Sequence, residues 1–131
     1  MTDEINNFSL LVVEDEQPLL EAIRAKLEKR NFKVTTARTA EQAYSYVTDG
    51  VKVDAIWLDH YLLGSKDGLD LVSNLKSAGS NFRNIPIFVV SNTASPSKVQ
   101  SYLRLGINKY FTKSNTKLED IVNDLKKNIE K

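Results

Sequence analysis

Two apolar runs that end in acidic residues are the most informative feature of this sequence. Residues 10–13 (Leu-Leu-Val-Val) are followed by Glu14 and Asp15, and residues 55–58 (Ala-Ile-Trp-Leu) are followed by Asp59. Short apolar runs bounded by polar turns are typical of strands in a parallel sheet that is covered on both faces. Two such strands would deliver three carboxylates to one shared site.

The residue types at this site suit a divalent cation and an anion. Clustered carboxylates repel one another, so each holds its proton more tightly unless a cation compensates. Oxygen ligands without His or Cys favour a hard ion such as Mg²⁺, which binds through one or two carboxylates plus water and phosphate oxygens. Ser91 and Lys113 follow two later apolar runs and are expected in the same crevice, where the lysine adds a positive charge.

The rest of the chain alternates strand-like and helix-like patterns. Strands are expected at residues 8–13, 32–37, 55–59, 85–90 and 110–112, with helices at about 18–30, 40–49, 68–77, 96–105 and 118–129. Thr39 is expected to cap the second helix, and Gly106 to follow the fourth in a left-handed conformation. Five strand–helix units predict an α/β fold, in which a doubly wound parallel sheet has helices on both faces. Ligands of such sheets bind beyond the carboxyl ends of the strands.

Length and composition predict a single domain without a broad charged surface. The chain has 131 residues, of which 41% are hydrophobic, with 18 basic and 17 acidic residues and no cysteine. We expect one domain over residues 1–131 with a core at about 8–130. The balanced charge favours neither nucleic acid nor an anionic membrane as a direct partner. The absence of a signal peptide or a long apolar run predicts a soluble, cytoplasmic protein.

Taken together and in this order, the motifs resemble the receiver domain of two-component response regulators, including those of chemotaxis. The resemblance covers essentially the whole chain. It is carried by Glu14-Asp15, residues 54–59, Asp67-Gly68, Ser91 and residues 110–113. It implies a five-stranded sheet of flavodoxin-like order 2-1-3-4-5 and five helices, in three layers.

The resemblance also implies a phosphorelay function centred on Asp59. This residue would accept a phosphoryl group from a histidine kinase or a histidine phosphotransfer protein and form an aspartyl phosphate. Mg²⁺ would be bound directly by Asp15 and Asp59, largely through water by Glu14, and by the backbone carbonyl of Tyr61. Phosphoryl transfer needs positioning and charge neutralisation more than covalent machinery, which agrees with these roles.

Three further residues would convert phosphorylation into a change of surface. Ser91 and Lys113 would bind phosphoryl oxygens, and Tyr110 would rotate into the space that Ser91 vacates. The altered face would comprise the fourth helix, the fifth strand and the fifth helix, through which a downstream effector or a second copy of the chain could bind. The protein would thus be a signalling switch that assists its own phosphotransfer and dephosphorylation, rather than an enzyme.

The sequence departs from the family pattern around the site. The loop after Asp59 has no proline, and Ser114 stands where the family commonly has a proline after the lysine, so we expect a trans Lys113–Ser114 bond. Asn92 is larger than the residue that usually follows the serine, and we expect it to shield the phosphoryl group. His60, the only histidine, is interpreted as a loop residue.

Two other functions remain open at this stage. The first is a receiver-like binding module that docks a partner without phosphorylation, which a phosphate-release assay would distinguish. The second is an aspartate-nucleophile phosphohydrolase, but such enzymes usually have a second acid two residues after the nucleophile, where this chain has Tyr61. A nucleotide-binding function is not supported, because no glycine-rich phosphate-binding motif occurs.

Overall fold

Five parallel strands form the centre of the molecule in a computed structural model that describes residues 8–77, 80–92 and 95–130. The strands are β1 (Ser9–Val13), β2 (Lys33–Ala37), β3 (Ala55–Leu58), β4 (Ile87–Ser91) and β5 (Lys109–Thr112). The sheet has the order β2-β1-β3-β4-β5, so β3 is its central strand and β1 pairs with both β2 and β3. The predicted doubly wound fold and strand order are therefore confirmed.

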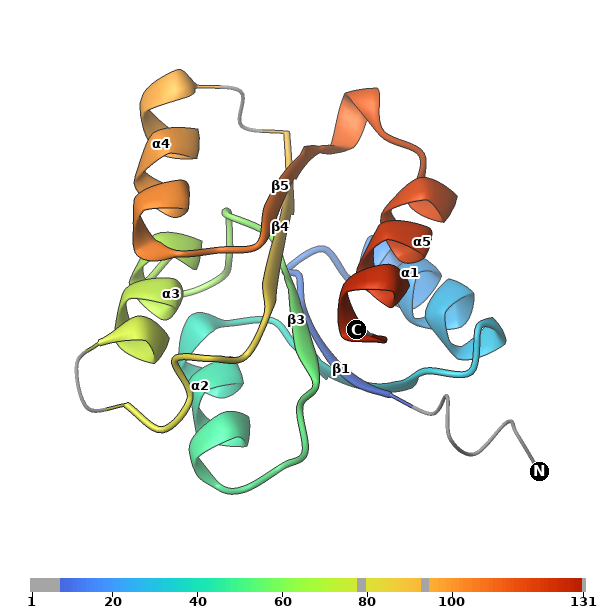
Figure 1. The fold of residues 1–131 in the computed structure, drawn as a ribbon, viewed down its shortest axis with the longest axis horizontal. Helices are drawn as coiled ribbons and strands as arrows, with labels where there is room; N and C mark the ends of the chain where they lie inside the picture. Colours follow the sequence, from blue (N-terminus) through green and yellow to red (C-terminus); the bar gives the residue numbers. More distant parts are fainter. Residues whose placement is uncertain (1–7, 78–79, 93–94, 131) are drawn as a thin grey trace.

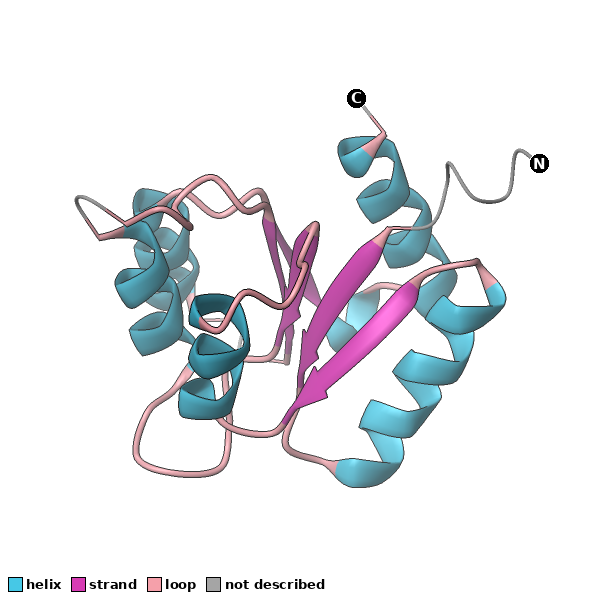
Figure 2. Ribbon diagram, turned by 90° about the horizontal axis from the view of Figure 1, so that it is seen from below, coloured by secondary structure: helices cyan, strands magenta, loops and turns pink. Residues whose placement is uncertain are grey.

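Helices cover both faces of this sheet and make three layers. In Figure 1, where the sheet is seen nearly edge-on, α1 (Gln17–Lys29) and α5 (Leu118–Ile129) lie on one side. The helices α2 (Ala40–Thr48), α3 (Gly68–Lys76) and α4 (Pro96–Leu105) lie on the other, and the view in Figure 2 shows the same division. No helix among the described residues is long and apolar enough to cross a membrane.

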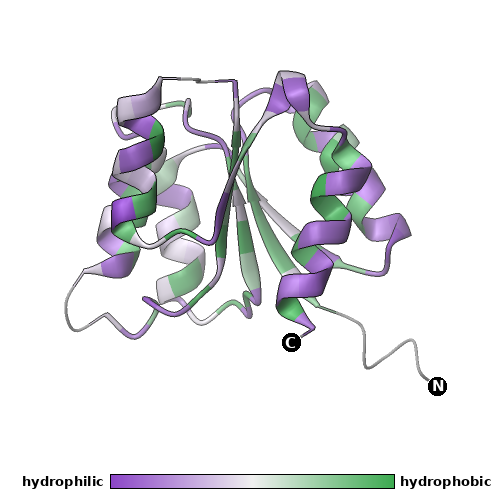
Figure 3. Cartoon of the chain, turned by 45° about the horizontal axis from the view of Figure 1, so that its top comes forward, coloured by the Kyte–Doolittle hydropathy of each residue, from purple (hydrophilic) through white to green (hydrophobic). Residues whose placement is uncertain are grey.

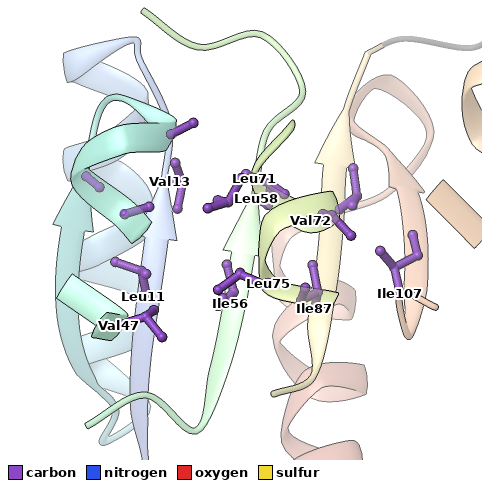
Figure 4. Packing of buried hydrophobic residues seen from close by; sticks show 14 of the residues in the cluster. Leu11, Val13, Val47, Ile56, Leu58, Leu71, Val72, Leu75, Ile87 and Ile107 are labelled. Carbon is purple, nitrogen blue, oxygen red and sulfur yellow. The ribbon is translucent and has the colours of Figure 1, made fainter. Parts of the chain in front are cut away.

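Alternation along the strands builds two cores, one on each face of the sheet. Leu11 and Ile56 face the α2–α3–α4 layer, whereas Leu10 and Trp57 face α1 and α5. Figure 4 shows the first of these cores, and Figure 3 shows that the hydrophobic residues gather on the strands and on the inner sides of the helices. Because β1, β3 and β4 are buried on both faces, they are the near-continuous apolar runs that the sequence displays.

Local signals in the sequence fix several helix ends. The Thr39 hydroxyl accepts a hydrogen bond from the Gln42 backbone N–H at 3.0 Å, as expected for an N-cap. Gly106 has φ 95° directly after α4, as predicted. Asp67 caps α3 through a reciprocal capping box with Asp70, which holds the start of this helix firmly.

Each strand differs from its expected bounds by one or two residues at one end or at both, and two of these differences bear on the site. β4 begins at Ile87 rather than at residue 85, because Pro86 has no N–H to donate and contributes only its carbonyl, to the Ile56 N–H. It extends through Ser91, which pairs with Thr112 instead of following the strand. β3 ends at Leu58, one residue before Asp59. Part of the turn expected at 78–81 lies outside the described residues.

Candidate functional site

The sheet register places Glu14 and Asp59 side by side. Val13 of β1 is paired with Leu58 of β3, so Glu14 and Asp59 follow at the carboxyl ends of adjacent strands. The Asp59 N–H donates to the Val13 carbonyl at 3.0 Å, which continues the ladder one residue beyond β3. Backbone pairing, rather than a flexible loop, therefore positions the two carboxylates.

Three carboxylates meet at this edge and form what we call the acidic cluster. One oxygen from each of Glu14, Asp15 and Asp59 lies within 4.8 Å of the others. Glu14 and Asp59 are only 2% and 5% exposed, whereas Asp15 is half-buried. Buried carboxylates need a compensating cation or hydrogen-bond donors, so this cluster has to be neutralised by its surroundings.

Lys113 supplies part of that neutralisation. It lies directly after β5, in the 3₁₀ turn η2 (Lys113–Asn115), and its Nζ donates to Glu14 Oε1 at 3.0 Å and to Asp59 Oδ2 at 3.2 Å. Residues from β1, β3 and β5 are thereby joined across the carboxyl edge of the sheet. The sequence-predicted residues Glu14, Asp15, Asp59 and Lys113 are thus brought together.

The charges within the site are only partly balanced. Burial raises the pKa of the Glu14 carboxyl to about 7, the nearby Asp59 charge adds to this, and the hydrogen bond from Lys113 opposes it. Burial alone would lower the pKa of Lys113, but its hydrogen bond to Glu14 and the charge of Asp59 outweigh burial and raise the pKa. Lys113 pairs with the carboxylates of Glu14 and Asp59 but not with that of Asp15, so the site favours a further cation.

The donor set fits a hard divalent ion. All three ligand groups of the acidic cluster are carboxylates, and neither His nor Cys belongs to it. Mg²⁺ prefers oxygen ligands and usually keeps several waters, so a half-buried Asp15 next to two buried carboxylates offers ligands together with access to solvent. The three carboxylates therefore could hold Mg²⁺.

Ser91 and Tyr110 lie on neighbouring strands close to this site. Ser91 is the last residue of β4 and is fully buried. Burial raises the pKa of Tyr110, and a hydrogen bond between its side chain and that of Ser91 lowers it. The side chains of Ser91 and Tyr110, which the sequence predicts to form the switch, are thus in contact in this structure.

Tyr61 lies in the loop after β3 with a largely exposed side chain. The side chain is 58% exposed, and its ring packs edge-on against His60 with the centroids 4.7 Å apart. The Tyr61 side chain is therefore directed largely to solvent, and it is not one of the groups of the acidic cluster. The assignment of its backbone carbonyl as a metal ligand stays a prediction.

Arg38 is a residue of the site that sequence reasoning missed. It directly follows β2, and its guanidinium donates twice to the backbone carbonyl of Asp15, from Nε at 3.0 Å and from the terminal nitrogen at 2.7 Å. Such a forked contact fixes the acceptor in one orientation. Arg38 therefore holds the backbone of a candidate metal ligand, and no local sequence pattern signals this.

Asn92 has a structural contact that was not foreseen. Its Oδ1 accepts a hydrogen bond from the Ser114 backbone N–H at 3.1 Å, which links the ends of β4 and β5. A proline at position 114 could not donate this bond. The Lys113–Ser114 bond is trans, as expected. Asn92 thus braces the turn that carries Lys113, and its shielding of a phosphoryl group stays a prediction.

His60 lies in a loop, as interpreted, but it is not a solvated residue. It is 2% exposed, and its Nδ1 is 2.6 Å from the Tyr102 hydroxyl of α4. Burial lowers the pKa of His60, with the Asp67 charge opposing this effect, and burial raises the pKa of Tyr102. The two residues are 42 positions apart in the sequence, so no spacing rule could have joined them.

Comparison with known proteins gives one consistent family. Residues 10–126 match the model of the response regulator receiver domain. The chain is 33% identical over 104 residues to the transcriptional regulatory protein DltR of Streptococcus agalactiae serotype III (strain NEM316). That alignment covers 79% of this chain and 44% of DltR, so the chain spans about half the length of this curated relative.

Solved structures show the same fold. A putative response regulator from Chloroflexus aurantiacus J-10-fl superposes with a TM-score of 0.84 at 22% identity, covering 95% of this chain and 99% of the other. The phosphorylated cyanobacterial phytochrome response regulator RcpA superposes with a TM-score of 0.78 at 25% identity, covering 95% of this chain and 92% of RcpA. Both likenesses extend over nearly the entire chain.

Proposed function

The chain belongs to the response regulator receiver domain family, and from this premise we propose that Asp59 is its phosphoacceptor in a two-component phosphorelay. One observation carries the proposal: Lys113 contacts both Asp59 and Glu14 in a buried acidic cluster at the carboxyl edge of the sheet. A structural ion pair would need one carboxylate, whereas three lie together here, and Lys113 pairs with Glu14 and Asp59, which leaves the Asp15 carboxylate for a further cation.

In this proposal each residue has a separate task. An oxygen of Asp59 attacks phosphorus, the donor's leaving group departs on the opposite side, and Lys113 moves from the carboxylate to a phosphoryl oxygen. Asp15 and Asp59 would hold Mg²⁺ directly, with the Tyr61 carbonyl as a further ligand and Glu14 largely through water, and the ion would neutralise charge on the transferred group. Ser91 gives up its contact with Tyr110 to bind another phosphoryl oxygen.

The phosphoryl donor is proposed to be a histidine kinase or a histidine phosphotransfer protein. Phosphorylation would change the face formed by α4, β5 and α5, which is the proposed surface for an effector or for a second copy of the chain. The protein would act as a signalling switch rather than as an enzyme. A cytoplasmic location stays a prediction.

The test is phosphorylation by acetyl phosphate with Mg²⁺, followed by intact mass. The wild-type chain should gain one phosphoryl group, Asp59→Asn should gain none, and removal of Mg²⁺ with a chelator should prevent the gain. Asp54→Asn is the matched control, because Asp54 lies at the opposite end of the same strand, where it accepts a hydrogen bond from the Ser9 N–H at 2.8 Å. A phosphoryl group on Asp59→Asn would place the acceptor elsewhere.

Binding of Mg²⁺ can be followed separately through Trp57. This buried side chain lies two residues before Asp59 and faces α1 and α5. We expect saturable binding that Asp15→Asn weakens, measured by tryptophan fluorescence or by amide chemical shifts. Equal affinity in the wild-type chain and in Asp15→Asn would contradict the assignment of Asp15 as a ligand.

A further inference from the structure

Helix α4 has a single fully buried side chain, beside which the partly buried Leu105 packs against the same core. Tyr102 is the one buried residue of α4, all of whose residues are described, whereas α1, α2, α3 and α5 each bury three or more. The free energy that holds a helix to its domain comes mainly from such burial. The position of α4 therefore depends on what surrounds the Tyr102 side chain.

Three residues surround Tyr102 and form what we call the Tyr102 seat: His60, Gly68 and Tyr110. The His60 Nδ1 is hydrogen bonded to the Tyr102 hydroxyl, and their rings meet edge-on with the centroids 5.7 Å apart. The Tyr110 ring lies 5.8 Å from the Tyr102 ring, centroid to centroid. Residues from the phosphoacceptor loop, from α3 and from β5 thus meet at one side chain of α4.

Gly68 makes room for this arrangement. A Cβ atom at position 68 would overlap the Tyr102 hydroxyl, and it would lie 3.0 Å from the carbonyl oxygen of Asp59 and 3.2 Å from the His60 Cα. The Gly68 N–H in turn donates to the His60 carbonyl at 2.9 Å. The Tyr102 hydroxyl and the carbonyl of the proposed phosphoacceptor therefore both lie next to Gly68.

The segment that carries Asp59 is held on both sides of this contact. The Asp59 N–H is bonded to β1, and the His60 carbonyl is bonded to the start of α3. With Tyr102 donating its O–H to Nδ1, the other ring nitrogen of His60 faces Asp67 Oδ2 at 3.8 Å. The backbone of Asp59 and His60 is thus held by hydrogen bonds to β1 and to α3, and the imidazole lies between Tyr102 and Asp67.

We propose that the His60–Tyr102 hydrogen bond couples the phosphoacceptor to α4, so that phosphorylation at Asp59 repositions this helix through Tyr102. This proposal rests on the proposed function and names the contact through which the site is read out. Tyr102 is a positioning residue here, because it touches neither the phosphoryl group nor the metal. Because Tyr102 also contacts Tyr110, the loop after β3 and the switch tyrosine act on the same side chain.

The test compares Tyr102→Phe, which keeps the ring and removes the hydroxyl, with the matched control Tyr46→Phe. The Tyr46 hydroxyl also accepts one hydrogen bond, from Gln42 Nε2 at 3.3 Å, but on an exposed part of α2. Each protein is studied with Mg²⁺, without and with beryllofluoride, a stable analogue of the phosphoryl group. Amide hydrogen exchange reports α4, and amide chemical shifts report Ser91 and Lys113.

In Tyr102→Phe, the amides of α4 should exchange about tenfold faster without the analogue, the factor expected for loss of one buried hydrogen bond. The analogue should still shift Ser91 and Lys113, but its effect on α4 should fall well below that in the wild-type chain. Tyr46→Phe should match the wild-type chain in both respects. His60→Asn, which keeps an acceptor near Nδ1, should retain more of the α4 response than His60→Leu.

Two results would overturn the proposal in different ways. An α4 response in Tyr102→Phe equal to that of the wild-type chain, with Ser91 and Lys113 shifted in both, refutes the coupling and leaves the phosphoacceptor role standing. An absence of any shift at Ser91 and Lys113 in the wild-type chain refutes the phosphoacceptor role, and the coupling falls with it.

Discussion

The two helices that flank β5 are attached to the molecule in different ways. On one face, α5 buries Ile121, Val122 and Leu125 in the core below it. On the other face, α4 buries Tyr102, whose hydroxyl is hydrogen bonded to His60 in the loop after β3. An element with little buried apolar surface opens more easily than one with a continuous apolar stripe.

Surface contacts reinforce this contrast. Glu119 at the start of α5 forms ion pairs with Lys26 of α1 at 2.9 Å and with Arg30, directly after α1, at 2.7 Å. The two helices α1 and α5 are therefore linked to each other as well as to the sheet. The comparison indicates that α5 is held firmly in place, whereas α4 is the helix whose position a small change at Asp59 can alter.

The largest expected effect is in the core below α5. Leu125→Ala removes a fully buried side chain and should lower the free energy of unfolding by ~2–5 kcal/mol, from lost burial and the cavity left behind. Urea denaturation followed by circular dichroism measures this loss. A loss below about 1 kcal/mol would mean that α5 is attached no more firmly than an exposed helix, and the contrast would fail.

The Tyr102 seat provides the second test. Gly68→Ala places a methyl group against the Tyr102 hydroxyl and should destabilise the protein by ~1–3 kcal/mol through overpacking. Thermal unfolding measures the change. Hydrogen exchange should show that the amides of α4 lose more protection than those of α5.

The double variant Gly68→Ala/Tyr102→Phe is the control for this prediction. Removing the hydroxyl relieves the tightest contact of the new methyl group, so the two changes should be less destabilising together than their sum. Additive effects would show that the methyl group disturbs the Asp59 and His60 backbone rather than the Tyr102 seat.

The acidic cluster gives a smaller effect, which depends on pH. The pKa of Glu14 is raised from 4.5 to about 7, so the folded chain holds this proton more tightly than the unfolded chain. Stability without metal should therefore fall as the pH rises from about 4.5 to about 7. If Mg²⁺ binds the deprotonated carboxylates as proposed, then at about ten times its Kd it should add ~1.4 kcal/mol above pH 7 and less at acidic pH.

Thermal unfolding of the wild-type chain and of Glu14→Gln, across this pH range, checks the prediction. The glutamine variant cannot ionise at this position. Its free energy of unfolding should therefore not show the decrease that the wild-type chain shows between about pH 4.5 and about pH 7. Stabilisation by Mg²⁺ should not remove the difference between the two helices, because the proposed metal site includes no residue of either helix. The amides of α4 should remain less protected from hydrogen exchange than those of α5. Equal protection of both helices in Mg²⁺ would break the comparison.

The smallest expected effect is on the outer surface of α4. Leu103 is 47% exposed beside the buried Tyr102, so Leu103→Ala should change the free energy of unfolding by less than about 0.5 kcal/mol. Urea denaturation checks this against Leu125→Ala. A destabilisation comparable to that of Leu125→Ala would show that Leu103 also holds α4 to the domain. The contrast between α4 and α5 would then fail.

Local chemistry explains which features the sequence could predict. The alternation of apolar runs specified the strand–helix order, and the cap at Thr39 and the left-handed Gly106 were confirmed at the expected positions. Asp59 and Glu14 could be placed together because parallel strands bring their carboxyl ends to one edge. These inferences depend on periodicity or on residues directly after a strand.

Contacts between distant side chains could not be predicted in this way. The hydrogen bond of His60 with Tyr102 and the contact of Arg38 with the Asp15 carbonyl join residues from different layers or strands. An apolar stripe on 96–105 would include Leu103 as readily as Tyr102, and only the packed structure shows that Tyr102 turns inward. The brace between Asn92 and Ser114 likewise needs two loops in place.

The most direct test of the account is hydrogen exchange of the wild-type chain before and after phosphorylation by acetyl phosphate in Mg²⁺. Peptides covering α4 (Pro96–Leu105) and α5 (Leu118–Ile129) are compared in the same experiment. The account predicts a change of several-fold in the exchange of α4, with the core-facing amides of α5 nearly unchanged. A change of equal size in both helices, or a phosphorylated chain with unaltered α4, would contradict it.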